Sequence, residues 1–253
     1  MNKFLVDTHC HVYSEYYDDI QDIYNTCIDN NINYLISSGV SDSSNSELLK
    51  LSSEYQNFYI TLGIHPEDAS KEYDLNFIKA NCQNQKVVAI GEIGLDYHYP
   101  EFDKEAQKKL FENQLKIAQD NNLPVVVHSR EATKDTIDIL KKYHVKGVIH
   151  SFSGSYETAQ IYLKMGFKLG VNGVITFKNA NIKDVIAKVG IQNILLETDS
   201  PYLTPEPLRG KKNHPINTKY VAEFISEYLG IDLDTVKNVT SANALEIFDK
   251  IQA

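Results

Sequence analysis

Eight short apolar runs alternate with longer stretches of helical spacing, and this alternation limits the fold of the chain more than any other feature. Runs such as VVAI and VVV are apolar at nearly every position, which suits strands buried on both faces in a parallel sheet covered by helices. Eight strand and helix units in 253 residues match the size of a closed (β/α)8 TIM barrel, and we predict that α/β fold. The runs cover residues 4–6, 34–37, 59–62, 87–90, 124–127, 147–149, 167–171 and 194–196.

The stretches between the runs indicate helices. Residues 102–119 repeat apolar side chains at helical spacing, and Asn121 and Asn122 mark the end. A doubly wound open sheet is the alternative, but it usually has fewer units and a Gly-rich phosphate loop after its first strand, where this chain has DTHCH. No linker or repeat interrupts the alternation, so we expect one domain over residues 1–253, with an extra C-terminal helical segment at 233–251.

The composition is that of an ordinary globular protein, with 42% hydrophobic and 23% charged residues. These values exclude disordered and collagen-like chains. Lys and Arg total 25 against 34 for Asp and Glu, and the net charge of −9 argues against a protein that coats nucleic acid through its overall field. Any contact with DNA must therefore be local.

The three cysteines, Cys10, Cys27 and Cys82, are an odd number at unrelated spacings, which argues against a disulfide framework or a zinc ribbon. They fit a reducing compartment. The first apolar stretch is too short for a signal peptide, and no later run approaches the length of a membrane span. We expect a soluble, cytoplasmic monomer without an obligate protein partner and without membrane contact.

Most histidines follow the predicted strands. Two carboxylates, Glu92 and Asp199, follow the fourth and eighth runs at the same level. His144 belongs to the opposite end of the predicted barrel and is expected on the surface. The other histidines are His9 and His11 after the first run, His65 after the third, His98 after the fourth, His128 and His150 at the ends of the fifth and sixth, and His214 in the loop after the eighth.

These positions predict an active site, because catalytic side chains of barrel enzymes lie at the C-terminal ends of the strands. His9 and His11 share a face of their strand and can chelate one cation, whereas Cys10 points the other way and is expected to pack. A single strand-end histidine is more often structural, but imidazoles and carboxylates together suit zinc, manganese, iron or magnesium. The set exceeds the needs of one tetrahedral ion, and two ions bridged by a carboxylate would use it all. His65 and His98 lack a chelating neighbour and are weighed as substrate contacts.

Arginine occurs only at Arg130 and Arg209 in a chain otherwise rich in lysine. Both lie in strand-end loops, and Arg forms bidentate contacts with phosphate that Lys cannot copy, which suggests oxyanion recognition. A helix cap or a surface ion pair is the alternative. Further candidates are Ser151, Ser153 and Gly154 as small donors to the same oxyanion, and Tyr97, Phe152 and Tyr202 as rings that either stack on bases or pack.

Six motifs occur in order along the chain: DTHCHV, GIHPED, GEIGLDYHY, PVVVHSREA, VIHSFSGS and ETDSPYLTPEPLRGKKNHP. In this order they resemble the TatD family of metal-dependent deoxyribonucleases, within the amidohydrolase-like barrels. The resemblance runs from residue 7 to residue 215 and continues into SANA at 241–244. One departure is His214, where the family commonly has Glu. The change removes a negative charge beside the expected phosphate path and leaves the metal ligands intact.

The resemblance implies two divalent metal ions (Mg, Mn or Zn) with Glu92 as the bridge, and 3′ to 5′ exonucleolytic action. We expect the substrate to be single-stranded or frayed DNA, bound locally at the barrel mouth. The implied metal ligands are His9, His11, Glu92, His128, His150 and Asp199. The residues expected to contact substrate are His65, Arg130, Ser153, Arg209 and Lys211.

We therefore predict a phosphodiesterase in which one ion acidifies a water and the other polarises the phosphoryl oxygen. Asp199 is expected to take the proton from that water, and Glu92 to share in catalysis by bridging the ions. Two alternatives stay open. The same site could hydrolyse an ester or amide, such as an aminoacyl-tRNA ester, or the barrel could be a catalytically silent binding protein. Arg130, Arg209, Lys211 and Lys212 favour phosphate, and the complete ligand set argues against a silent barrel.

Overall fold

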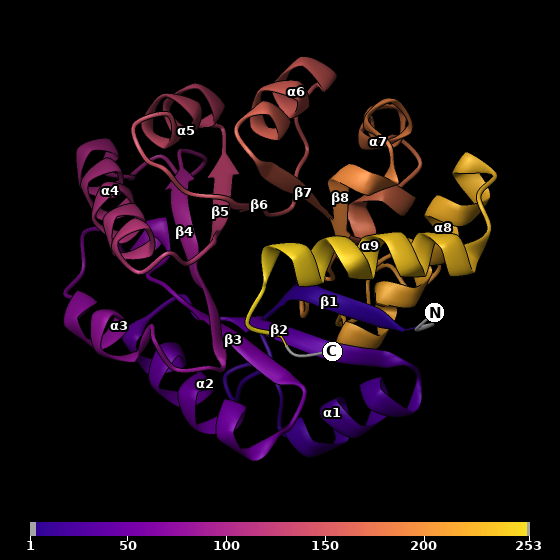
Figure 1. Cartoon of the computed structure of the whole chain (residues 1–253), viewed down its shortest axis with the longest axis horizontal. Helices are drawn as coiled ribbons and strands as arrows, with labels where there is room; N and C mark the ends of the chain where they lie inside the picture. Colours follow the sequence, from indigo (N-terminus) through magenta and orange to yellow (C-terminus); the bar gives the residue numbers. More distant parts are fainter. Residues whose placement is uncertain (1–3, 252–253) are drawn as a thin grey trace.

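The computed structural model describes residues 4–251, in which eight parallel strands form one sheet in the order of the sequence (Figure 1). Each strand pairs with the next one along the chain. The predicted (β/α)8 barrel is confirmed. The strands are β1 (Leu5–Cys10), β2 (Ile32–Ser38), β3 (Phe58–Leu62), β4 (Val87–Asp96), β5 (Val125–Arg130), β6 (Gly147–Ile149), β7 (Phe167–Val171) and β8 (Ile194–Leu196).

The sheet closes where β1 meets the segment that follows β8. The backbone N–H of Asp199 donates to the carbonyl of His9 over 2.9 Å, and the N–H of His11 donates to the carbonyl of Ser200 over 2.7 Å. A single parallel bridge between Cys10 and Ser200 completes the join. These bonds bring the carboxyl end of β1 beside Asp199, although about 190 residues separate them in sequence.

Helices surround the sheet in Figure 1, as the alternating pattern predicts. The longest, α4, follows its sequence signals: the Asp103 carboxylate caps its first turn, and Asn121 ends it. No helix within residues 4–251 has both the length and the apolar character needed to cross a membrane. The helices are α1 (Ile20–Asp29), α2 (Asp42–Glu54), α3 (Leu75–Asn81), α4 (Lys104–Asp120), α5 (Thr133–Leu140), α6 (Tyr156–Lys164), α7 (Ile182–Val189), α8 (Thr218–Leu229) and α9 (Leu233–Ile247).

The strands are buried on both faces, as their unbroken apolar runs predict. In β5, Val125 and Val127 pack in the large core between sheet and helices, whereas Val126 belongs to a second core inside the barrel. This inner core includes Ile247 and Phe248 from the end of α9. The extra C-terminal segment therefore packs one face of α9 against the inner core and leaves the other face exposed, and in Figure 1 it lies next to β1.

Three strands extend further than their apolar runs. β1 continues to Cys10, β4 to Asp96 and β5 to Arg130. Backbone pairing goes on through the polar residues, for example between Gly94 and His128. The side chains that interrupt the apolar pattern are therefore held by the sheet itself and not by loose loops.

Candidate metal centre

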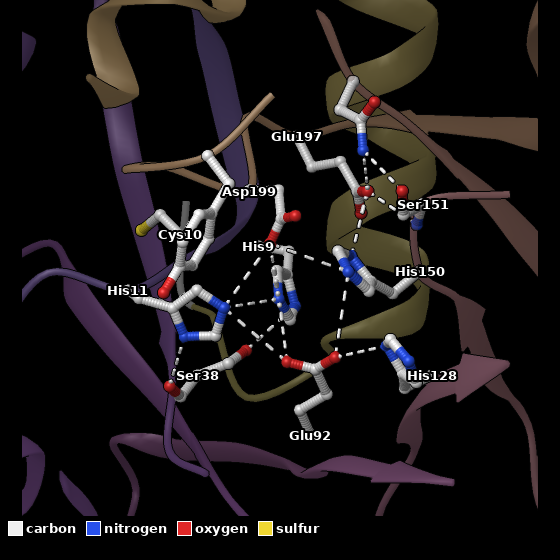
Figure 2. A network of polar contacts seen from close by, with 12 residues as sticks. His9, Cys10, His11, Ser38, Glu92, His128, His150, Ser151, Glu197 and Asp199 are labelled. Atoms are coloured by element: carbon white, nitrogen blue, oxygen red, sulfur yellow. Dashed lines mark hydrogen bonds and ion pairs between the residues drawn. The ribbon is translucent and has the colours of Figure 1, made fainter. Parts of the chain in front are cut away.

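The six implied ligands converge at the carboxyl ends of the strands, where Figure 2 shows them facing one another. They come from five places in the barrel, so no single segment builds the site. All of them are buried or nearly so. They are His9 and His11 on β1, Glu92 on β4, His128 on β5, His150 directly after β6, and Asp199 in the segment after β8.

Four of these residues place donor atoms close together around the inner nitrogens of His9 and His11. The Nε2 atom of His9 lies 3.3 Å from His11 Nε2, 3.3 Å from Glu92 Oε2 and 3.5 Å from Asp199 Oδ1. His11 Nε2 lies 3.6 Å from the same Glu92 oxygen and 3.4 Å from the same Asp199 oxygen. Separations of this size are those of donor atoms that bind one ion through bonds of about 2.0–2.2 Å. The donor set therefore fits one divalent cation.

The other oxygen of Glu92 faces a second group of donors. Glu92 Oε1 lies 2.9 Å from His128 Nδ1, 3.8 Å from His150 Nε2 and 3.6 Å from His65 Nε2. Asp199 Oδ1 also approaches His150 Nε2, at 3.6 Å. The carboxylate of Glu92 is thus placed between two clusters of nitrogen atoms, one for each of its oxygens.

Ser38 holds the two histidines of β1 from behind. Its backbone carbonyl lies 3.1 Å from His11 Nδ1, and its hydroxyl lies 3.0 Å from His9 Nδ1. The Thr61 hydroxyl donates to the Gly91 carbonyl over 2.7 Å, and its oxygen lies 3.0 Å from Ser38 Oγ. Fixing the outer nitrogen of a ligating histidine orients the ring and leaves the inner nitrogen for the metal. Sequence reasoning missed Ser38, since a serine at a strand end carries no distinctive signal.

Two buried acids support the histidines of the second group. Asp96 Oδ2 lies 3.0 Å from His128 Nε2. Glu197 Oε1 makes an ion-pair contact of 3.0 Å with His150 Nδ1 and accepts the backbone N–H of Ser151. Sequence reasoning missed both acids, although each lies in a quoted motif, four residues after Glu92 or two before Asp199. A carboxylate inside an apolar strand is the signal that could have found them.

The space for Glu197 depends on a glycine in β7. A Cβ atom at Gly170 would lie 2.2 Å from Glu197 Oε2, far inside van der Waals contact. The buried acid therefore occupies the position that a side chain on β7 would take, and Gly170 is needed for close approach.

The site is strongly polarised without a metal. Burial acts to raise the pKa of Glu92, but the imidazoles of His9, His150 and His128 outweigh it and hold that pKa well below its usual range. Burial acts to lower the pKa of His128, but Asp96 and Glu92 raise it to about 9. For His150, burial is outweighed chiefly by Glu197, and the pKa rises to about 10. Positive charge is thus favoured at this position, which is what a bound cation supplies.

A cavity of about 470 Å³ opens above the cluster. His65 and Arg130, both expected to contact substrate, line it. Burial lowers the pKa of His65 to about 4. The guanidinium of Arg130 lies 5.7 Å from the centre of the Tyr99 ring. Tyr202 also lines the cavity, with 48% of its surface exposed.

Three other expected substrate contacts lie outside this cavity. Ser153 is exposed in the segment after β6. The guanidinium of Arg209 lies over the ring of Phe177, 4.3 Å from its centre. Lys211 is exposed, and its backbone carbonyl accepts the Thr204 hydroxyl.

The remaining candidates make structural contacts. His98 is exposed and pairs with Glu131 at 2.7 Å, and His144 is exposed. Cys10 is buried in the outer core, and its thiol donates to the carbonyl of Ile36. Tyr97 stacks on Phe102 and Phe152 packs against Tyr162, which matches the packing alternative for both rings.

His214 caps the short 3-10 helix η4 (Pro215–Asn217). Its Nδ1 atom accepts the backbone N–H of Ile216 over 3.1 Å. The ring lies near Tyr17, and His214 does not belong to the groups of His, Asp and Glu side chains that could hold a metal ion, which we call the metal-facing cluster. An imidazole nitrogen here performs a capping task that a carboxylate oxygen can also perform.

Comparisons with known proteins agree with this geometry. A profile of the TatD related DNase family matches residues 6–249. YabD of Bacillus subtilis, named as an uncharacterized metal-dependent hydrolase, is 39% identical over 251 residues, covering 96% of this chain and 98% of YabD. YcfH of Escherichia coli, with the same description, is 33% identical over 253 residues, covering 97% of this chain and 96% of YcfH.

A solved structure extends the similarity to three dimensions. The crystal structure of YjjV, a TatD homolog from Escherichia coli, matches with a TM-score of 0.91 at 30% identity, covering 98% of each chain. Family profile, relatives and structure all span nearly the whole barrel, including every residue of the metal-facing cluster. This chain belongs to the TatD family of metal-dependent hydrolases.

Proposed function

We propose that this protein hydrolyses phosphodiester bonds of DNA and uses two divalent cations bridged by Glu92. One observation carries the proposal: the two oxygens of Glu92 face two separate groups of donor atoms. His9, His11 and Asp199 would hold one cation with Glu92, and His128 and His150 would hold the other. When bound, the pair supplies an acidified water and neutralises charge on the phosphoryl oxygens.

The protein's own residues have separate tasks in this reaction. Asp199 is nearly buried and faces the cavity, and we assign to its carboxylate the removal of the proton from the attacking water. Arg130 lines the cavity, and we assign to its guanidinium a contact with a phosphate oxygen. The exposed ring of Tyr202 offers a surface on which a base can stack.

We propose the end of a single strand, rather than a duplex, as the substrate. The cavity of about 470 Å³ lies within the range of small-ligand pockets. The family is named for DNases, and action from the 3′ end on single-stranded or frayed DNA follows from the family resemblance.

The experiment tests a single preparation of the protein for hydrolysis of phosphodiester and carboxyl ester bonds. Metal-reconstituted protein is incubated with 5′-labelled and 3′-labelled single-stranded DNA, an aminoacyl-tRNA and a generic carboxyl ester. We expect a ladder of shortened DNA whose pattern gives the polarity, and no ladder after chelation. Turnover of an ester but not of DNA would replace the proposal by a carboxyl-ester hydrolase. Binding of DNA without any turnover would indicate a silent barrel.

The variant Asp199→Asn tests the assigned proton acceptor in the same assay. Asn is close to Asp in size, so the fold and much of the DNA affinity should remain. It cannot accept the water proton, and we expect kcat to fall about a hundredfold or more. Cleavage at the parent rate, with both metals retained, would show that another group activates the water.

A further inference from the structure

The histidines around the cavity differ in the nitrogen that they direct into it: this nitrogen either carries a proton or can offer a lone pair. A neutral imidazole carries a proton on one nitrogen and a lone pair on the other, and only the lone pair can bind a metal. The partner of the outer nitrogen therefore determines what the inner nitrogen offers. The five histidines that surround Glu92 differ in the partner of this outer nitrogen.

Three of the implied ligands have an acceptor behind the ring. The outer nitrogen of His11 faces the Ser38 carbonyl at 3.1 Å. The outer nitrogens of His128 and His150 face the carboxylates of Asp96 and Glu197, each at 3.0 Å. A carbonyl or a carboxylate can only accept, so each outer nitrogen carries a proton, and the inner nitrogen is the one that offers its lone pair to a metal once its own proton is displaced.

His9 follows the same rule through a hydroxyl. Its outer nitrogen lies 3.0 Å from Ser38 Oγ. The Thr61 hydroxyl donates to the Gly91 carbonyl over 2.7 Å, so the Ser38 hydroxyl can donate to Thr61 Oγ1, 3.0 Å away, and its oxygen can accept from His9. The inner nitrogens of His9 and His11, 3.3 Å apart, then both face the group that includes Glu92 Oε2 and Asp199 Oδ1.

His65 has the opposite arrangement. It caps the 3-10 helix η1 (Pro66–Asp68), and its outer nitrogen, Nδ1, accepts the backbone N–H of Glu67 over 3.3 Å. A backbone N–H can only donate, so Nδ1 holds the lone pair and the inner Nε2 carries the proton. That N–H lies 3.6 Å from Glu92 Oε1, which is too long for a hydrogen bond, and His65 lines the cavity.

We propose that His65 is a fixed hydrogen-bond donor to the reacting phosphate and not a third ligand beside Glu92 and His128. Its Nε2–H would donate to a non-bridging phosphoryl oxygen and stabilise the charge that grows there, without proton transfer. The proposal rests on the proposed phosphodiesterase function for the identity of the oxygen. The assignment of the proton to Nε2 of His65 rests on the η1 cap alone.

His65 could otherwise be taken for a ligand. His65, Glu92 and His128 lie close enough to hold an ion, and the His65 and His128 rings are 4.7 Å apart. Binding a metal through Nε2 would move the proton to Nδ1, where it would meet the N–H of Glu67. The cap on η1 would then be lost, which disfavours this binding mode.

Nitrogen NMR tests the donor directly and needs no substrate. In protein labelled with 15N at histidine and titrated with Zn²⁺, His65 should show a protonated Nε2 before and after metal addition. The inner nitrogens of His9, His11, His128 and His150 should shift as zinc binds. The His65→Asn spectrum identifies the His65 signals. A metal-induced shift of His65 Nε2, or a proton on Nδ1, would overturn the assignment.

Two variants test the role in turnover. His65→Asn keeps a good N-cap residue but removes the donor, and His65→Ala removes both. We expect each to bind the same number of metal ions as the parent and to lose about a hundredfold or more in kcat, as when one preorganised donor is removed. His98→Asn, at an exposed histidine paired with Glu131, is the matched control and should leave turnover unchanged.

The outcomes separate this proposal from the proposed function. Loss of a metal equivalent in His65→Asn would make His65 a ligand, and unchanged turnover would make it a capping residue only. If the parent hydrolyses a carboxyl ester and not DNA, the proposed function fails. The NMR result would still decide the donor, and the same variants would then be assayed on the ester.

Discussion

At the scale of single residues, the carboxylate of Glu92 lies between two groups of metal-binding candidates, one facing each of its oxygens. The oxygens of Glu92 face different histidines. The four histidines among the implied ligands are each fixed from behind by Ser38, Asp96 or Glu197. The cluster is therefore preorganised before any cation binds, because the rings need not turn to present their nitrogen atoms. Substitution of Glu92 should therefore affect metal content differently from substitution of a single histidine.

Replacement of Glu92 should cost both ions, and replacement of a terminal histidine should cost mainly one. We expect Glu92→Ala to bind almost no metal, because it removes a ligand from each group. His128→Ala should keep the ion beside His9 and His11 and weaken the other. Elemental analysis after gel filtration gives the stoichiometry. Equal occupancy in the two variants would remove Glu92 from the bridging position.

At the scale of elements, the sequence predicts the barrel well where apolar runs end abruptly. β6, β7 and β8 have the predicted bounds, because charged or turn-forming residues flank them. β4 runs six residues beyond its predicted end at Ile90, because backbone pairing does not require apolar side chains and hydropathy does not register it. The positions at strand ends single out the histidines and carboxylates, and the family resemblance implies which six of them bind metal; the structure brings these six together.

The support of those residues could not be predicted in the same way. Whether Asp96 or Glu197 holds a histidine depends on which ring nitrogen points inward, and that is decided by strands far apart in sequence. The inward N–H of His65 likewise depends on the η1 cap. Arg209 was expected beside the phosphate path, but its loop places it over Phe177.

α9 gives a prediction at this scale. Phe248, at its end, is fully buried in the core inside the barrel, away from the metal-facing ends of the strands. We expect Phe248→Ala to lower the free energy of unfolding by about 3–5 kcal/mol, the usual cost of removing a buried phenyl ring. Metal content of the folded fraction should not change. Urea denaturation and elemental analysis measure the two effects. Loss of metal in a variant of unchanged stability would contradict the assignment of Phe248 to stability and not to the metal site.

At the scale of the whole molecule, charge limits how DNA can bind. The chain carries a net charge of −9, which gives no long-range attraction to DNA, so under the proposed function the cations and Arg130 would have to supply it locally. The cavity wall also contains acids, among them Glu67 and Asp68, and Lys71 at the rim is paired with Asp68. Affinity should therefore depend on few phosphate contacts.

Arg130→Ala tests this limit. We expect a raised KM for single-stranded DNA and a slope of log affinity against log salt that is flatter by about 0.7, the value for one phosphate contact. Lys134→Ala, which removes a charge of the same sign from an exposed pair with Asp138, should leave the slope unchanged. Fluorescence anisotropy over a salt series measures both. A flatter slope in Arg209→Ala would extend the DNA path beyond the cavity.

Metal binding should depend on pH across the whole cluster. Contacts with Asp96 and Glu92 raise the pKa of His128 to about 9 against the effect of burial, so a cation must displace a proton from this ring below that pH. Apparent metal affinity should therefore rise between about pH 6 and pH 9, by about tenfold per pH unit for each proton released. Calorimetry in two buffers of different ionisation enthalpy counts the protons. A flat affinity without proton release would contradict the raised pKa.

Closure of the barrel between β1 and the segment after β8 also bears on how the protein matures. His9 and His11 are made early in translation, but they meet Asp199 only after about 190 further residues have been synthesised. Contacts over such a separation form late in folding. A nascent chain would therefore offer only scattered histidines, and the donor atoms of the site would come together only when the ring of strands is complete. Acquisition of the cation would thus report a finished barrel, and a stalled or truncated chain would be left unmetallated and inactive.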